Sequence, residues 1–144
     1  MISEGKIIAC CISEKKGVPK REVSKVILVE NYGVQNDAHA GGDRQVSLLS
    51  IADVKNSGID APPGGFGENL LVEGIDFSLL KPGIKIALNS EVILEVTQIG
   101  KKCHSKCTIF YKTGKCIMPS RGVFARVLRG GEVQKGMSIR IYEE

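Results

Sequence analysis

The stretch IKIALNSEVILEVTQ, residues 84–98, decides the fold class of this chain. Residues 84–88 and 91–98 are two alternating runs rich in apolar side chains, and Asn89-Ser90 between them is a tight-turn signal. Side chains that alternate along a strand point to opposite faces, so each run can bury one face. The stretch therefore predicts an antiparallel β-hairpin.

Similar short runs lie on both sides of the predicted hairpin. Strands are expected at residues 6–12, 23–30, 45–50, 67–72, 122–128 and 137–142, each bounded by glycine, proline or polar residues. Residues 31–44, NYGVQNDAHAGGDR, have the composition of a loop, and Gly130-Gly131 is expected to join the last two strands. Many short strands with glycine turns indicate a mostly β domain, a closed or nearly closed barrel of at least six strands.

One or two short helices interrupt this β pattern. Ser50 can cap a helix over residues 51–57, which Gly58 ends. Residues 77–80 are expected to form a helical turn before Pro82-Gly83. The composition marks no linker, and 144 residues suit one domain, so a single domain over residues 1–144 is expected.

The sequence also predicts where the protein resides. No apolar segment approaches the roughly 18 residues of a membrane span, and residues 1–5 do not begin a secretory signal. The five cysteines are odd in number. A reducing cytoplasm is therefore expected, without a membrane partner, and there thiols serve ligation or redox chemistry.

Positive charge is concentrated in one region of the chain. Residues 96–131 hold eight Lys/Arg and no acid, whereas the other residues hold 12 bases and 16 acids. The same region contains Cys103, Cys107 and Cys116. Nearby cations lower the pKa of a thiol and attract anions such as phosphate, so Cys103 and Cys107 are candidate thiolates. A solvated lysine surface beside buried cysteines is the alternative.

Aromatic residues are scarce in this basic region. It contains Phe110, Tyr111 and Phe124 and no tryptophan. Surfaces that bind single-stranded nucleic acid combine cations with stacking aromatics, so a nucleic-acid partner is not expected.

Two glycine-containing motifs outside the basic region hold further candidate site residues. His39 stands before Gly41-Gly42, and Arg44 follows with a guanidinium that can contact phosphate or carboxylate through two hydrogen bonds. An ordinary polar turn with His39 bonded to an aspartate is the alternative. Glu68-Asn69 follows Gly67 and could hold a heterocycle or brace a loop.

A zinc site is a second possibility for the basic region. Cys103, His104, Cys107 and Cys116 supply enough ligands for tetrahedral coordination. No CxxC pair is present, so the spacing is weak support. This interpretation describes a structural zinc-binding β-domain that acts as a protein-interaction module.

Together these motifs resemble the MOSC domain family, the module found at the C-terminus of molybdenum cofactor sulfurases and in small free-standing proteins. The resemblance rests on the order and spacing of motifs along nearly the whole chain. They are Gly33 with DAHAG at 37–41, RQVSLL at 44–49, GENL at 67–70, LKPG at 80–83, LEVTQ at 94–98 followed by Cys103, and RGVFARV at 121–127 with Gly130-Gly131.

The resemblance implies a β-barrel that binds the molybdenum cofactor (molybdopterin) or handles its sulfur. It implies that Cys103 is the functional thiol, ligating molybdenum or carrying a persulfide. Sulfur transfer by Cys103 would make the chain an enzyme, and a cysteine desulfurase or a molybdoenzyme would be its partner. The anionic pterin is expected to contact His39, Gly41, Gly42, Arg44, Glu68, Asn69, Lys101, Lys102, Arg121 and Arg126. The glycine loop at 37–44 and Cys103 are accordingly expected to line one pocket.

Overall fold

The computed structural model describes residues 3–100 and 121–142. Most of this part of the chain is strand. The elements are β1 (Ser3–Ile12), β2 (Arg21–Val23), β3 (Lys25–Val29), β4 (Gly33–Val34), β5 (Val46–Ser50), α1 (Ile51–Asn56), β6 (Leu70–Glu73), the 3-10 helix η1 (Phe77–Leu79), β7 (Lys85–Leu88), β8 (Val92–Ile99), β9 (Val123–Arg129), β10 (Gly131–Gln134) and β11 (Ser138–Tyr142).

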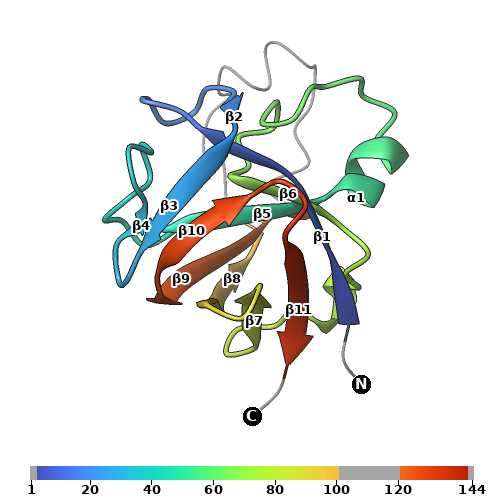
Figure 1. The fold of residues 1–144 in the computed structure, drawn as a ribbon. Helices are drawn as coiled ribbons and strands as arrows, with labels where there is room; N and C mark the ends of the chain where they lie inside the picture. Colours follow the sequence, from blue (N-terminus) through green and yellow to red (C-terminus); the bar gives the residue numbers. More distant parts are fainter. Residues whose placement is uncertain (1–2, 101–120, 143–144) are drawn as a thin grey trace.

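Seven of the described strands close into a barrel (Figure 1). Their order is β11-β7-β8-β9-β5-β6-β1, and the ring closes because β1 also pairs with β11. The β5–β6 pair is parallel, whereas the other pairs in the ring are antiparallel. The predicted β-barrel with one short α-helix is therefore confirmed.

Strand β1 is long enough to pair with three partners. Residues 3–6 pair with β11 and residues 10–12 pair with β2, while residues 6–10 pair with β6 on the other edge. The end of β1 and the whole of β2 thus extend beyond the ring. A smaller sheet, β10-β3-β4, packs Val26, Leu28 and Val133 into the same core as the barrel interior.

The two faces of the barrel wall bury different clusters. Leu48, Leu70 and Val123 belong to the interior core. Leu49, Leu71 and Phe124, the next residues along the same strands, belong to a second cluster with Val54 of α1 and Phe66. Helix α1 and the loop at 59–66 therefore cover part of the outer face.

Cys10 and Cys11 illustrate this alternation. The prediction placed one in the core and the other on a sheet face. Cys10 lies in the interior core and Cys11 in the outer cluster, and both are free thiols that are fully buried. Burial raises the pKa of both, with Glu22 adding to the rise, and that of Cys10 reaches about 11.

The predicted hairpin and helix are present. Leu88 pairs with Val92 across the turn, where Asn89 adopts a positive φ of 57°. The Ser50 side chain accepts a hydrogen bond from the Ala52 N–H, as an N-cap does. Gly58 follows the helix with a φ of 74°, which suits a residue without Cβ.

Three strand predictions need correction. The expected strand at 23–30 is two strands, β2 and β3, because at Ser24 the chain passes from β2, which pairs with β1, into the small sheet. The expected loop at 31–44 contains the short strand β4. The Gly130-Gly131 connection leads into β10, which pairs with β3 and not with a barrel strand.

Within residues 3–100 and 121–142, no helix has the length and hydropathy needed to cross a membrane.

Candidate functional site

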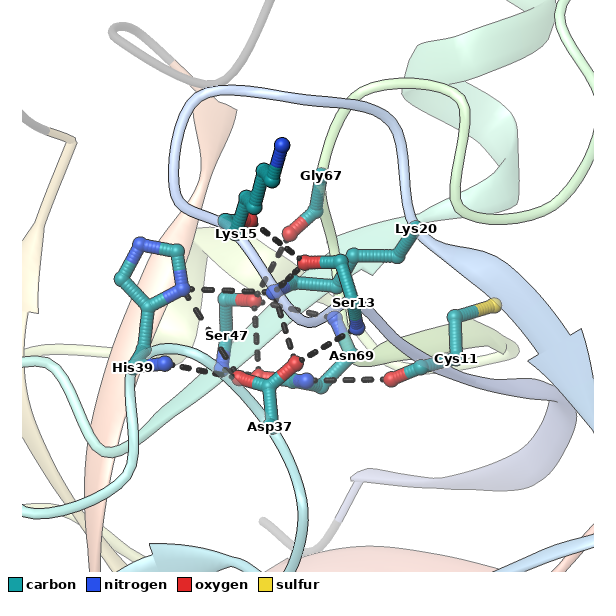
Figure 2. Close-up of polar contacts among 9 residues, drawn as sticks. All are labelled: Cys11, Ser13, Lys15, Lys20, Asp37, His39, Ser47, Gly67 and Asn69. Carbon is teal, nitrogen blue, oxygen red and sulfur yellow. Dashed lines mark hydrogen bonds and ion pairs between the residues drawn. The ribbon is translucent and has the colours of Figure 1, made fainter.

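Three loops meet in a buried polar cluster beyond the end of β1 (Figure 2). We call Ser13, Lys20, Asp37 and His39 the Lys20–Asp37 cluster. Ser13 and Lys20 come from the loop after β1, and Asp37 and His39 come from the loop after β4. The backbone of Lys20 donates a hydrogen bond to the Gly64 carbonyl, which attaches the third loop.

Lys20 and Asp37 form an ion pair inside the protein. The Lys20 Nζ lies 2.8 Å from Asp37 Oδ1, and their side chains are 1% and 0% exposed. Lys20 also donates to Ser13 Oγ at 3.1 Å, and the Ser13 N–H donates to Asp37 Oδ1 at 3.0 Å. A buried charge pair is tolerated when further hydrogen bonds satisfy both groups, as they do here.

Asp37 is ionised because of these contacts. Burial by itself would raise its pKa. The hydrogen bond and the charge of Lys20, together with the Ser13 N–H, hold the pKa of Asp37 well below its usual range. The backbone N–H of His39 also donates to Asp37 Oδ2 at 3.1 Å. Asp37 therefore fixes the start of the glycine loop as a full anion.

His39 connects this cluster to the surface. Its Nδ1 lies 3.2 Å from the Lys20 Nζ, and its side chain is 21% exposed. Figure 2 shows Nδ1 turned toward Lys20 and the other ring nitrogen turned away from the cluster. The alternative in which His39 bonds to an aspartate holds for its backbone N–H, which donates to Asp37 Oδ2. The ring Nδ1 lies 3.7 Å from the same oxygen, an ion-pair distance that is too long for a hydrogen bond.

A cavity of about 360 Å³ opens beside His39. We call it the His39 cavity. Its lining residues are Lys16, His39, Gly42, Asp43, Arg44 and Gln98. Two full positive charges face one negative charge, so the described lining is net positive. The Arg44 guanidinium lies over the Phe124 ring, 5.7 Å from its centroid, which restrains the guanidinium at the cavity wall.

The structure thus brings three predicted binding residues together, His39, Gly42 and Arg44. Gly41 lies in the same loop, where its N–H donates to the Tyr32 carbonyl and its φ is 82°. A Cβ at Gly41 would contact the Tyr32 ring at 3.4 Å, so Gly41 shapes the loop beside the cavity lining.

Glu68 and Asn69 do not line the His39 cavity, and both brace loops. Both side chains belong to fully buried residues, 1% and 0% exposed. Glu68 accepts hydrogen bonds from the N–H groups of Gly64 and Phe66, and burial raises its pKa. The Asn69 amide donates to the Cys11 carbonyl, and its oxygen accepts from the Ser47 N–H. Of the two predicted roles for this motif, bracing is the one that these contacts describe.

The remaining predicted cations lie elsewhere or outside the described residues. Arg121 lines a second cavity of about 390 Å³ with residues of α1 and η1. Arg126, half exposed on β9, donates through Nε to Glu95 Oε1 at 2.7 Å. Cys103, Lys101 and Lys102 lie outside the described residues, so the expectation that Cys103 shares a pocket with the glycine loop stays a prediction.

Residues 3–100 and 121–142 contain no group of three or more His, Cys, Asp or Glu side chains that could hold a metal ion. The zinc interpretation rests on Cys103, His104, Cys107 and Cys116, which lie outside these ranges.

Sequence reasoning missed Lys16, Lys20 and Gln98. Lys16 and Lys20 flank Gly17 and Pro19 in a polar segment, where lysine normally marks solvated surface. Nothing local distinguishes Lys20, which is buried because Asp37, 17 residues away, supplies its counter-charge. Gln98 was visible only as the end of the LEVTQ motif.

Comparison with known proteins supports the fold and the family. The MOSC domain family matches residues 35–140. The crystal structure of the YUAD protein from Bacillus subtilis superimposes with a TM-score of 0.80 at 20% identity, covering 99% of each chain. YiiM from Geobacillus stearothermophilus gives a TM-score of 0.71 at 18% identity, covering 96% of this chain and 75% of its own. YiiM from Escherichia coli gives 0.63 at 17% identity, covering 96% and 70%. No curated protein matches the sequence.

Proposed function

Because this chain belongs to the MOSC domain family, which is associated with the C-terminal domain of molybdenum cofactor sulfurases, we propose that it binds the molybdenum cofactor or a pterin intermediate of it. The His39 cavity would receive the anionic part of this ligand, and Cys103 would contact its metal or its sulfur. The compartment in this proposal is the cytoplasm.

The observation that carries the proposal is the chemistry of the His39 cavity. A loop that was singled out from sequence presents His39, Gly42 and Arg44 to one space, and Lys16 adds a second full cation. Arginine and lysine are the usual partners of phosphate, and glycine allows a ligand to approach the backbone closely. The cavity volume of about 360 Å³ falls within the usual range for small-molecule sites. These residues fit an anionic pterin.

Chain connectivity allows Cys103 to take part. Gln98 lines the cavity and precedes Cys103 by five residues. Five residues span at most about 18 Å, so the covalent chain permits contact between the thiol and a ligand in this cavity. The cofactor would supply the redox and sulfur chemistry of molybdenum when bound. The residues of this chain would hold it, neutralise its charge and provide a soft ligand.

Sulfur carriage is the second part of the proposal. The Cys103 thiolate would attack the outer sulfur of a persulfide on a donor such as a cysteine desulfurase. A new S–S bond forms on Cys103 as the S–S bond of the donor breaks, and the donor leaves as a thiolate. The exchange needs no further oxidant or reductant. Attack of a second thiol on the inner sulfur of the Cys103 persulfide would release the outer sulfur as sulfide and leave a disulfide on Cys103, and this sulfide would reach the cofactor of a molybdoenzyme partner.

The experiment is identification of what co-purifies with the protein from cells that make the cofactor. Molybdenum is measured by elemental mass spectrometry, the pterin by fluorescence after oxidation, and a Cys103 persulfide by peptide mass spectrometry. We expect pterin in the wild-type protein, and a loss of at least about tenfold in retention for Arg44→Ala, since a charged hydrogen bond contributes roughly 1.5–3 kcal/mol.

Matched variants make the outcome specific. Arg129→Ala removes an exposed arginine of β9 outside the His39 cavity and should retain the pterin as wild type does. Cys103→Ser should lose molybdenum or persulfide, whereas Cys116→Ser should keep them. Stoichiometric zinc without pterin or molybdenum would contradict the proposal and favour the zinc interaction module. Equal retention in Arg44→Ala and Arg129→Ala would remove the His39 cavity from it.

A further inference from the structure

We infer that Lys20 is a positioning residue that fixes His39 as a hydrogen-bond donor, through its Nε2–H, toward an oxyanion in the His39 cavity. The inference rests on the proposed function for the identity of the ligand. Its structural part concerns the Lys20–Asp37 cluster alone and is tested without any cofactor.

The first step is the state of Lys20. Asp37 Oδ1 lies 2.8 Å from the Lys20 Nζ, and both side chains are shielded from solvent. The lowered pKa of Asp37 keeps its carboxyl group ionised. A carboxylate at this distance stabilises the ammonium form of lysine. An ammonium group donates three hydrogen bonds and accepts none. Lys20 therefore approaches each of its neighbours as a donor.

The second step is the consequence for His39. Its Nδ1 lies 3.2 Å from the Lys20 Nζ, within hydrogen-bond distance. Because Lys20 can only donate, Nδ1 must present a lone pair to it. An Nδ1 proton would point at the ammonium, and its other neighbour, Asp37 Oδ2, is 3.7 Å away, beyond a hydrogen bond. The neutral ring consequently carries its proton on Nε2.

The third step concerns the cavity. His39 lines it, and the ring nitrogen that is not turned toward Lys20 points away from the buried cluster (Figure 2). The cavity thus receives an N–H donor in addition to the cations Lys16 and Arg44 that line it. An oxyanion accepts from such a donor. A metal ion does not bind to it, because one ring nitrogen carries a proton and the other is engaged by Lys20.

The same geometry shows how a carboxylate in place of the Lys20 ammonium would change the tautomer of His39. A carboxylate at the position of the Lys20 Nζ would accept a proton from Nδ1 and leave a lone pair on Nε2, as happens for histidines that bind metals. The Lys20 ammonium selects the opposite tautomer. The donor state of His39 in the cavity is therefore set by Lys20, which is 4% exposed and does not line the cavity.

The test is long-range ¹H–¹⁵N correlation spectroscopy of the imidazole nitrogens at neutral pH. His39 and His104 are the two histidines, so His104→Gln leaves His39 as the single signal. We expect one proton on Nε2 and a bare Nδ1. Protonation at Nδ1, or at both nitrogens, would overturn the inference. This readout decides the matter even if the cofactor experiment fails.

Variants of Lys20 test the cause. In Lys20→Met, Nδ1 keeps Asp37 Oδ2 as an acceptor 3.7 Å away, and we expect the proton to move to Nδ1. Lys20→Arg keeps a cationic donor and should keep Nε2–H. If Lys20→Met folds and Nε2–H still dominates, Lys20 does not position His39. If neither variant folds, the wild-type tautomer remains the deciding result.

Two probes test the Nε2 edge of the His39 ring, and both are applied to the His104→Gln protein. Inorganic sulfate should shift the Nε2 and Hε2 resonances in a saturable manner, and this response should weaken at least about tenfold in Arg44→Ala, which loses a charged hydrogen bond. Zinc ions should leave the His39 resonances unchanged. Absence of a saturable sulfate shift, or coordination of zinc by His39, would overturn the assignment of Nε2–H to an oxyanion.

Discussion

Asp37→Asn tests the central claim about the buried ion pair. The substitution removes one charge from a pair whose side chains are 0% and 1% exposed, and leaves the Lys20 ammonium without its counter-ion. Removal of one partner of a buried pair costs about 3–5 kcal/mol. Asparagine retains an oxygen that can accept from Lys20 and from the Ser13 N–H, so we expect a loss near the lower end, about 3 kcal/mol. For a domain of this size that corresponds to about 10 °C in Tm.

The dependence on pH separates this mechanism from simple damage to packing. The pKa of folded Asp37 lies below that of the unfolded chain, so its contribution is fully present above the unfolded value of roughly 3.9. The contribution declines as the pH falls from about 5 toward the folded pKa. The stability difference between wild type and Asp37→Asn should therefore be largest at neutral pH and shrink under acidic conditions.

The assay is urea unfolding of both proteins at a series of pH values from neutral to acidic, followed by far-UV circular dichroism. Asp60→Asn is the control, because Asp60 is exposed and its removal should change the unfolding free energy by less than about 0.5 kcal/mol. A difference between wild type and Asp37→Asn that is below 1 kcal/mol at neutral pH, or that stays constant as the pH is lowered, would refute the argument.

Three further predictions follow from other features. Gly64→Ala should destabilise the protein by at least about 2 kcal/mol more than Gly58→Ala in urea unfolding. Both glycines have a φ near 80°, but a Cβ at Gly64 would lie 2.2 Å from the Lys20 carbonyl oxygen, whereas none of the described atoms lies within 4 Å of a Cβ at Gly58. Equal losses in the two variants would show that the structure relieves the close approach at Gly64. In folded protein at pH 7, iodoacetamide should label Cys103 before Cys10 or Cys11, because burial raises the pKa of Cys10 and Cys11. Residue-resolved mass spectrometry measures the labelling rates, and equal rates at Cys103 and Cys10 would contradict the prediction. Arg126→Ala should cost less than about 1 kcal/mol, because its pair with Glu95 is half exposed and screened by solvent; thermal unfolding at low and high salt tests this, and a larger, salt-independent loss would count against it.

The fold was predictable where local signals and tertiary structure agree. Ser50 as the N-cap of α1 and the turn at Asn89 are determined by short-range chemistry, and both are present. Strand β10 was missed because Gly131–Gln134 buries only Val133, so its sequence lacks the alternation that identifies a strand. The break at Ser24 was missed because it reflects a change of pairing partner, which residues far away in the sequence decide.

The site was predictable to a smaller extent. The glycine loop was visible because histidine, glycine and arginine occur there in one short segment, and His39, Gly42 and Arg44 do share a cavity. Lys20 was not visible, since its role depends on burial against Asp37, and burial of a lysine has no local signature. The polar residues Glu68 and Asn69 were identified as special, but sequence could not decide between contact with a ligand and support of a loop.

The pairing of β1 with β11 has a consequence for how the molecule acquires its structure. Ser3 is opposite Ile141, so the contacts that close the ring join residues almost a full chain length apart. Contacts of such long sequence separation form late and slow the folding reaction. While the protein is being synthesised, the edges of β1 and β7 that β11 later covers have no partner strand, and unpaired edges invite association with other chains. Release of residues 138–142 from the ribosome is then the event that converts an open, association-prone sheet into a barrel.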